Sequence, residues 1–138
     1  MKRDRVYLPL AAPVPFAPDQ ASALPRLIAV LESSFDGIFI TDAQALPLWC
    51  NHSYEVISGL SAADVLGVPM AELVRRGTVS TSATLQALAQ EQAVTLEQTF
   101  TTGRRAVVTS TPIYDRDDRV CLVVTNVRDI SELIALQE

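Results

Sequence analysis

The sequence predicts an α+β fold, in which an antiparallel sheet carries helices over one of its faces. Two short β-type segments come first, a block of helical segments follows, and three β-type segments come last. Strands grouped on either side of a helical block favour an antiparallel sheet, whereas strands that alternate with helices favour a parallel one. The last three segments are joined by turns, as in two consecutive hairpins. A hydrophobic fraction of 49% in 138 residues is enough for one core, so a single domain is expected.

The N-terminal segment differs in composition from the rest of the chain. Four prolines stand there among small and apolar residues, at Pro9, Pro13, Pro15 and Pro18. Proline at this density favours extended chain and interrupts regular structure. We therefore expect residues 1–20 to form a proline-rich, flexible arm.

A helix is predicted next, over residues 21–34. Pro25 is tolerated in a first helical turn, and Leu27, Ile28 and Leu31 then recur at helical spacing. Two serines after these residues mark the expected end of the helix.

The first two strands are short. Residues 35–42 are apolar without clean alternation, so both faces of this strand are expected to be covered. A turn leads to the second strand, at residues 47–50.

Several helices are expected between the two groups of strands. Asn51 is a suitable N-cap for a helix that stops at Gly59. The capping-box pattern of residues 61–64 begins a short second helix. Pro69 opens a third, and residues 80–92 form the longest of the block.

The period then changes to that of strands. Residues 94–100 alternate at period two, residues 106–113 are rich in β-formers, and residues 120–127 are the most strongly β-type part of the chain. Residues 129–132 repeat the capping-box pattern and predict a final helix.

Composition excludes several classes of function. The formal charge of -5 and the two short arginine pairs do not provide the basic face that a nucleic-acid site needs, so no direct contact with nucleic acid is expected. No apolar run is long enough to cross a bilayer and no signal-peptide core follows Met1, which predicts a cytoplasmic protein without membrane contact. His52 is the single histidine and stands beside no nucleophile signature, so neither an enzyme nor a metal site is expected.

The order of these segments, with these residues, resembles the PAS family. The matching residues are Asp36-Gly37-Ile38 through Thr41-Asp42, then Asn51, Gly59 and Gly67, and the closing Arg128-Asp129-Ile130-Ser131. The likeness runs from about Leu27 to Ile130. It implies a PAS core at residues 35–129, with the start of a C-terminal signalling helix at residues 130–138. It also implies a five-stranded antiparallel sheet in the order two, one, five, four, three, with helices over one face and flanking helices at both ends.

A narrower likeness is to the PAS segments of sigma-54-dependent bacterial transcription activators. It rests on Gly77, residues 80–85, Thr95, Gln98, Val108-Thr109, Thr111-Pro112 and residues 123–133. The likeness implies a sensor in transcription regulation, with ATPase and DNA-binding domains outside this chain. The chain itself contains no P-loop motif.

The resemblance also bears on the two cysteines and on cofactors. Strand one would separate Cys50 from Cys121 by roughly 9–10 Å, which is beyond disulfide reach, so both are expected as free thiols. Haem-binding relatives take a histidine from the long helix, here residues 80–92, which contains none. Photosensing flavin relatives carry a reactive cysteine in an Asn-Cys-Arg-Phe context, which is absent here. No cofactor is therefore expected, although non-covalently bound flavin stays open.

A ligand pocket is the expected site. Alignment of the last strand with relatives places Cys121, Val123, Thr125 and Val127 toward the helices, and Leu122 and Val124 on the other face. The pocket candidates are Ile38, Ile40, Trp49, Tyr54, Leu73, Phe100, Val108, Ser110, Val123 and Thr125. The hydroxyls of Ser110 and Thr125 would need partners in such an interior, which a ligand or the neighbouring groups and water could supply.

Two functions follow as hypotheses. The first is a ligand-responsive regulatory domain that signals through a junction at Arg128, Asp129, Ser131 and Glu132. The second is a constitutive dimerisation module with a packed interior and no ligand. In both, Leu27, Ile28 and Leu31 of the flanking helix are expected to cover the outer sheet face and to form a homodimer interface.

Overall fold

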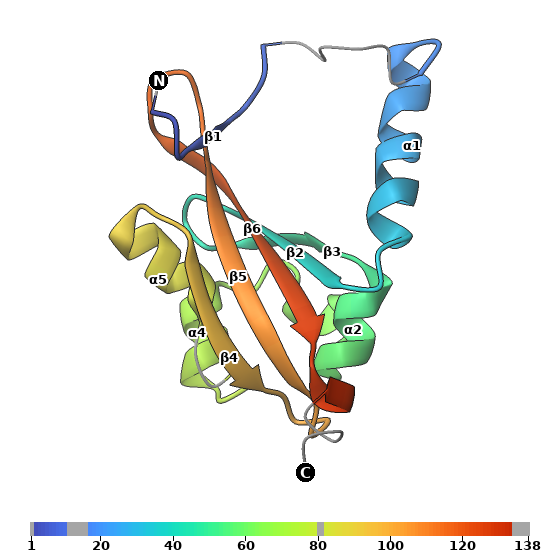
Figure 1. Ribbon diagram of the computed structural model, residues 1–138, viewed down its shortest axis with the longest axis vertical. Helices are drawn as coiled ribbons and strands as arrows, with labels where there is room; N and C mark the ends of the chain where they lie inside the picture. The colour runs from blue at the N-terminus through green and yellow to red at the C-terminus, as the bar shows by residue number, and fades with distance from the viewer. Residues whose placement is uncertain (1, 11–16, 80–81, 134–138) are drawn as a thin grey trace.

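The computed structural model describes residues 2–10, 17–79 and 82–133, which form a curved sheet with helices packed on one face (Figure 1). The elements, in chain order, are β1 (Val6–Tyr7), α1 (Gln20–Glu32), β2 (Gly37–Asp42), β3 (Pro47–Cys50), α2 (His52–Ser58), α3 (Ala62–Val65), α4 (Met70–Arg75), α5 (Ala83–Gln90), β4 (Val94–Thr99), β5 (Arg105–Tyr114) and β6 (Val120–Asp129). No helix of the described ranges is both long and apolar enough to span a bilayer.

The sheet has the expected order with one addition. β3, β2, β6, β5 and β4 are neighbours in that sequence, and each of these pairs is antiparallel. This confirms the order two, one, five, four, three. The short β1 adds a sixth strand, parallel to β5, so the sheet is mixed and not purely antiparallel.

Two strands share one edge of β5, and Pro112 lies where they meet. β4 pairs with β5 as far as Ser110, and β1 takes over at Ile113. At this edge the Arg104 carbonyl accepts from the Phe100 N–H, and the Tyr114 carbonyl accepts from the Leu8 N–H. The even-numbered residues of β5 therefore direct their backbone groups to the edge shared by β4 and β1. Proline has no backbone N–H to offer, and Pro112 occupies the gap where no strand would accept one.

The core lies between the sheet and the helices. α2 packs on β2, and α5 packs across β4, β5 and β6. Val65, Leu73, Val123 and Val127 are almost completely buried in this layer. Gly37 explains the close fit of α2, because a Cβ at this residue would lie 2.9 Å from the Tyr54 Cα.

Asn51 joins three elements and confirms its predicted role as an N-cap. Its Oδ1 accepts bonds from the backbone N–H groups of Tyr54 at 3.0 Å and Ile38 at 2.8 Å. Its Nδ2 donates to the carbonyls of Leu31 at 3.0 Å and Asp36 at 3.1 Å. One buried side chain therefore fixes the end of α1, the start of β2 and the start of α2 relative to one another.

α1 does not cover the outer sheet face, and this expectation was wrong. The helix has no buried residue, and Leu24 and Val30 are 63% and 57% exposed. Figure 1 shows α1 standing away from the sheet. The cause lies at its C-terminal end, where Asn51 bonds to Leu31 and the His52 N–H donates to the Glu32 carboxylate at 2.8 Å, which fixes the direction of the helix.

Residues 2–10 form a strap on the sheet, which differs from the flexible arm expected over residues 1–20. The Leu8 N–H donates to the Tyr114 carbonyl at 2.8 Å. The Arg5 guanidinium lies 4.1 Å from the centre of the Tyr114 ring and 3.3 Å from an Asp118 carboxylate oxygen. The Tyr7 hydroxyl donates to the same carboxylate. The prolines at 13 and 15 lie outside the described residues.

The ends of two predicted helices also lie outside the described residues. α5 begins at the Ser82 cap, whose hydroxyl accepts from the Leu85 N–H at 3.1 Å, while residues 80–81 are not described. At the C-terminus a helical turn is present at residues 131–133. The part of the expected signalling helix beyond Leu133 falls outside the described chain.

Candidate functional site

A small cavity of about 30 Å³ lies between the inner sheet face and the helices. Aromatic and aliphatic side chains make most of its wall, and Phe39 stacks on Tyr54 with ring centres 4.9 Å apart. The described lining residues are Phe39, Tyr54, Met70, Val79, Ser82, Ala83, Thr84, Gln98, Phe100, Val108, Thr125 and Val127. None of them carries a charge.

Three buried hydroxyls form a chain beside this cavity. Thr125 on β6 lies at its centre, 2.6 Å from the Ser110 hydroxyl on β5 and 3.1 Å from the Thr84 hydroxyl on α5. The register brings this about, because Ser110 and Thr125 stand directly opposite each other. Of the two alternatives for these hydroxyls, the structure shows pairing with neighbouring groups. The Thr84 bond also connects the helix layer to the strand that leads to the C-terminus.

Gln98 is a polar side chain of the cavity wall with no hydrogen-bond partner among the described residues. It is 8% exposed and lines the cavity from β4. Its side-chain amide makes no hydrogen bond within the described part of the chain, whereas Thr84 and Thr125 bond to each other. No side-chain nitrogen or oxygen of the described residues is both fully buried and unpaired, so the Gln98 amide atoms keep some contact with solvent. The Gln98 amide is therefore available to a small molecule that takes the place of this solvent.

The predicted pocket residues fall into three groups. Tyr54, Phe100, Val108 and Thr125 line the cavity, and Ser110 bonds to Thr125 directly behind its wall. Leu73 and Val123 are buried in the surrounding core without lining it.

Ile38, Ile40 and Trp49 form the third group, and the structure contradicts their assignment to the pocket. In β2 the buried residues are Gly37, Phe39 and Thr41, so the two isoleucines point to the opposite face. Trp49 pairs with Ile40 and shares that face. The sequence of this strand is apolar without alternation, so it does not indicate which residues face the helices.

Several lining residues were not among the predicted candidates. Phe39 and Met70 complete the apolar wall, and Thr84 and Gln98 add polar groups. Gln98 stands in the alternating segment Val94–Thr99, where the apolar residues Val94 and Leu96 have the same parity as Gln98 and face inward with it. This alternation was the signal available in the sequence.

The cavity does not fit a flavin in the described conformation. Ligand pockets typically have volumes of about 300–1,000 Å³, roughly ten times that of this cavity or more. No cysteine lines it, so the wall offers no thiol for covalent flavin chemistry. The described residues contain no cluster of metal-ligating side chains, and His52 is exposed on α2, with its Nδ1 3.5 Å from Glu55.

Both cysteines of the described chain are free thiols, as predicted. Cys50 is buried on β3, and burial, followed by the charges of Glu55 and Glu32, raises its pKa to about 11. Cys121 is half-buried and its thiol donates to the Ile113 carbonyl at 3.3 Å. β2 alone lies between β3 and β6, the strands that carry the two cysteines, as expected from the sheet order.

The end of β6 carries a compact set of polar contacts. Asp129 accepts a bond from the Ser131 N–H at 2.9 Å and pairs with Arg104 at 2.7 Å. The Ser131 hydroxyl in turn accepts from the Arg105 N–H at 2.8 Å. Partial burial raises the pKa of Asp129, but the bonds from Ser131 and Arg104 outweigh it and lower the net value. The predicted junction residues Asp129 and Ser131 are thus tied to the start of β5.

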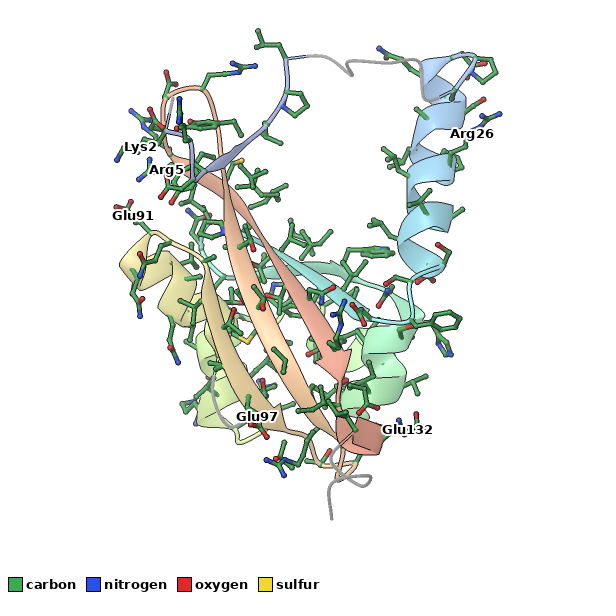
Figure 2. All side chains as sticks on the ribbon, in the orientation of Figure 1. Lys2, Arg5, Arg26, Glu91, Glu97 and Glu132 are labelled. Atoms are coloured by element: carbon green, nitrogen blue, oxygen red, sulfur yellow. The ribbon has the colours of Figure 1, made fainter. Side chains whose placement is uncertain are left out.

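The two remaining junction residues lie differently. Arg128 pairs with Asp36 at 3.1 Å, which connects the end of β6 to the residue before β2. Glu132 is exposed beyond the sheet (Figure 2). Asn51 bonds to the carbonyls of Leu31, at the end of α1, and of Asp36. Asp36 in turn pairs with Arg128, so it connects the end of α1 to the end of β6.

The sequence and the fold were compared with protein-family models and with solved structures. The family model described as PAS fold matches residues 26–130. The structure of an RNA-binding Light-Oxygen-Voltage receptor is similar with a TM-score of 0.66 and 20% identity, over 91% of this chain and 38% of that one. The PAS domain of a protein from Colwellia psychrerythraea matches with a TM-score of 0.55 and 21% identity, over 79% of this chain and 98% of that one.

A third structure, the PAS domain of Bordetella pertussis BvgS, has a TM-score of 0.57 and 17% identity, over 84% of this chain and 92% of that one. No curated protein matches the sequence. At these identities the solved structures support the fold, while the family model covers most of the chain. Together with the sheet order and the helix layer on its inner face, this match shows that the chain belongs to the PAS family.

Proposed function

We propose that this PAS domain is a ligand-responsive regulatory module whose sensing site is the interior cavity. PAS domains are typically sensory modules without catalytic activity. The observation that carries the proposal is the polar set inside an otherwise apolar interior, formed by the unpartnered Gln98 amide and the hydroxyl chain of Thr84, Thr125 and Ser110. In a core needed only for packing, apolar residues of similar shape could stand in place of these polar groups.

The route of the signal follows β6. Thr125 and Val127 face the cavity on this strand, and Asp129 ends it. A ligand that displaces α5 would stretch or break the bond between Thr84 and Thr125, and would change the position of β6 relative to the helix layer. The contacts of Asp129 and Ser131 with Arg104 and Arg105 would transmit this change to the following helix. The size of the response is limited by the difference in ligand affinity between the two packings.

A dimer is part of this proposal, and α1 is its interface. Leu27 and Ile28 are exposed and Leu31 is half-buried, so the helix offers apolar side chains to a second copy. An isolated helix of this length is marginal in water, and packing against a partner would stabilise it. A second apolar surface lies on the outer sheet face, where the half-buried residues are Ile38, Ile40, Trp49, Leu122 and Val124.

The small volume of the cavity favours a second candidate, a constitutive dimerisation module without ligand. A cavity of about 30 Å³ has room for water or a molecule of very few heavy atoms, so a ligand of ordinary metabolite size requires α5 to move. In this alternative the hydroxyl chain would fix the packing of α5 on the sheet, and α1 would carry the whole function.

The output is proposed to be a transcription activator of the sigma-54-dependent type. The support is the sequence likeness of residues 123–133 and of the segment from Gly77 to Pro112 to the sensors of those activators. In such a protein the ATPase and DNA-binding domains would follow the junction, in a bacterial cytoplasm.

Mass spectrometry of small molecules that copurify with the natively folded protein tests the first function against the second. A copurifying molecule should raise the melting temperature when added back, and should change hydrogen exchange at residues 131–133. The variant Asp129→Ala should keep the thermal shift and lose the change in exchange. Absence of any copurifying molecule, together with no thermal shift across a metabolite panel, would contradict the ligand-responsive function and support the dimerisation module.

A further inference from the structure

We propose that the cavity selects uncharged ligands, and that Gln98 is the residue that recognises them through a paired donor and acceptor. The inference rests on the proposed function, because it names the chemical class that the sensing site would accept. It excludes carboxylates, phosphates and ammonium groups from this interior.

The first argument is the charge of the wall. The described lining residues are apolar, aromatic, hydroxyl or amide side chains, and none is Asp, Glu, Lys, Arg or His. A charged group that leaves water for such an interior without an ionic partner loses much of its solvation free energy. An anion or cation would therefore bind only outside the cavity.

The second argument is the distribution of hydrogen-bonding capacity. Thr125 already bonds to both Thr84 and Ser110, so the hydroxyl chain is internally satisfied. Gln98, by contrast, is more than nine-tenths buried, and its side chain makes no hydrogen bond to a described residue. Its amide presents one carbonyl acceptor and two N–H donors. The group that complements it carries a donor and an acceptor on one edge, as an amide, a urea or an alcohol does.

The third argument is size. The cavity of about 30 Å³ accepts water or a molecule of very few heavy atoms before the helices move. A fragment of three heavy atoms binds at best with a dissociation constant of about 1 mM. The test therefore uses very small probes at high concentration and reads their position, because their affinity is low.

The experiment compares formamide with formate, which have the same number of heavy atoms and differ in charge. Each is titrated, at matched ionic strength, into the full chain labelled for NMR. The side-chain NH₂ signal of Gln98 and the methyl signals of Val108 and Val127 report on the cavity. Formamide should shift these signals, and formate should not.

Gln98→Met is the variant that removes the amide while it keeps an unbranched side chain of similar length. The formamide shifts at Val108 and Val127 should fall at least severalfold in this variant. Gln86→Met on the exposed face of α5 is the matched control and should leave them unchanged. If Gln98→Met proves poorly folded, the wild-type comparison of the two probes still decides the question.

Three results would overturn the inference: equal or larger shifts with formate, undiminished formamide shifts in Gln98→Met, or no shift with either probe. Different results would contradict the proposed function. Formamide that occupies the cavity without any change in exchange at residues 131–133 would contradict signalling and leave the selectivity intact. A copurifying anion located in the cavity would contradict the selectivity and leave the sensing function intact.

Discussion

The hydroxyl groups of Ser110 and Thr125 lie 2.6 Å apart across two neighbouring strands, and both residues are buried. Thr84 reaches the same Thr125 oxygen from α5 at 3.1 Å. The chain of three hydroxyls is therefore a contact between layers as well as within the sheet.

The variant Thr125→Val should destabilise the domain by about 1–3 kcal/mol, because it leaves two buried hydroxyls without partners. Urea denaturation measures this change. The triple variant Ser110→Ala, Thr84→Val, Thr125→Val should recover much of the loss, since it removes every unpaired group. Thr109→Val breaks the exposed Thr95–Thr109 pair and is the control, with an expected effect of at most about 0.5 kcal/mol. An equal loss of unfolding free energy in Thr109→Val would show that burial of the three hydroxyls does not determine their contribution to stability.

The variant Gly37→Ala should disturb the packing of α2, since the added methyl group would lie 2.9 Å from the Tyr54 Cα. The expected cost is about 1–3 kcal/mol, as for other overpacked cores. The ring signals of Phe39 and Tyr54 should shift in an NMR spectrum, because the two rings are stacked. Gly103→Ala meets no atom within 4 Å and strains only its own positive φ, so it should leave those ring signals in place. Unchanged rings in Gly37→Ala would contradict the close contact.

The strap should detach in acid. The hydrogen bond from Tyr7, assisted by Arg5, lowers the pKa of Asp118 below the ordinary value of 3.8. A lowered pKa in the folded state stabilises the strap above pH 3.8, and this stabilisation is lost as the pH falls through the folded value. The amide signal of Leu8, which bonds to Tyr114, should follow this transition. The transition should vanish in Asp118→Asn and persist in Asp117→Asn; a transition that survives in Asp118→Asn would refute the assignment.

The two thiols should react at different rates. Cys50 is buried with a pKa of about 11, so almost no reactive thiolate is present at mildly alkaline pH. Burial also raises the pKa of Cys121, but this residue is more accessible. Iodoacetamide followed by peptide mass spectrometry should therefore find Cys121 modified first, and Cys50 only when the domain unfolds. Equal rates in the native protein would show that β3 opens readily.

The proposed interface predicts a dimer that a charge on α1 disrupts. Leu27→Glu, and separately Ile28→Glu, should shift the protein to a monomer in sedimentation experiments, because a carboxylate would be buried against apolar side chains. Gln86→Glu on the exposed side of α5 is the matched control and should leave the dimer intact. A monomeric wild-type protein, or a dimer unaffected by both α1 variants, would rule out this interface.

Local signals predicted much of the fold, because the physics that produces them is local. Asn51 caps the helix that follows it, and Asp129 bonds to Ser131 at the start of the last turn, as their sequence spacing indicates. The strand order needed more than local signals. It came from the resemblance of the whole pattern to a known family, which the sheet pairing then confirmed.

The errors concern relationships that no short window of sequence contains. Ile38 and Ile40 were assigned inward, although the packing of Gly37 against Tyr54 turns the other parity of β2 to the helices. The direction of α1 depends on bonds from Asn51 and His52, twenty residues away. The strap depends on Asp118, which is more than a hundred residues from Tyr7.

The position of Pro112 has a consequence for how this domain could diverge or be re-engineered. A slip of two residues keeps every side chain on its own face of the sheet, and an edge strand has unpaired backbone groups to which a neighbour can add. Pro112 lies on β5 between the residues that pair with β4 and those that pair with β1, and it offers no N–H donor. Neither β4 nor β1 would gain a hydrogen bond from this residue by extending along β5. The strap can therefore be lengthened, shortened or exchanged for another peptide without a change of register in the hairpin that carries Gln98.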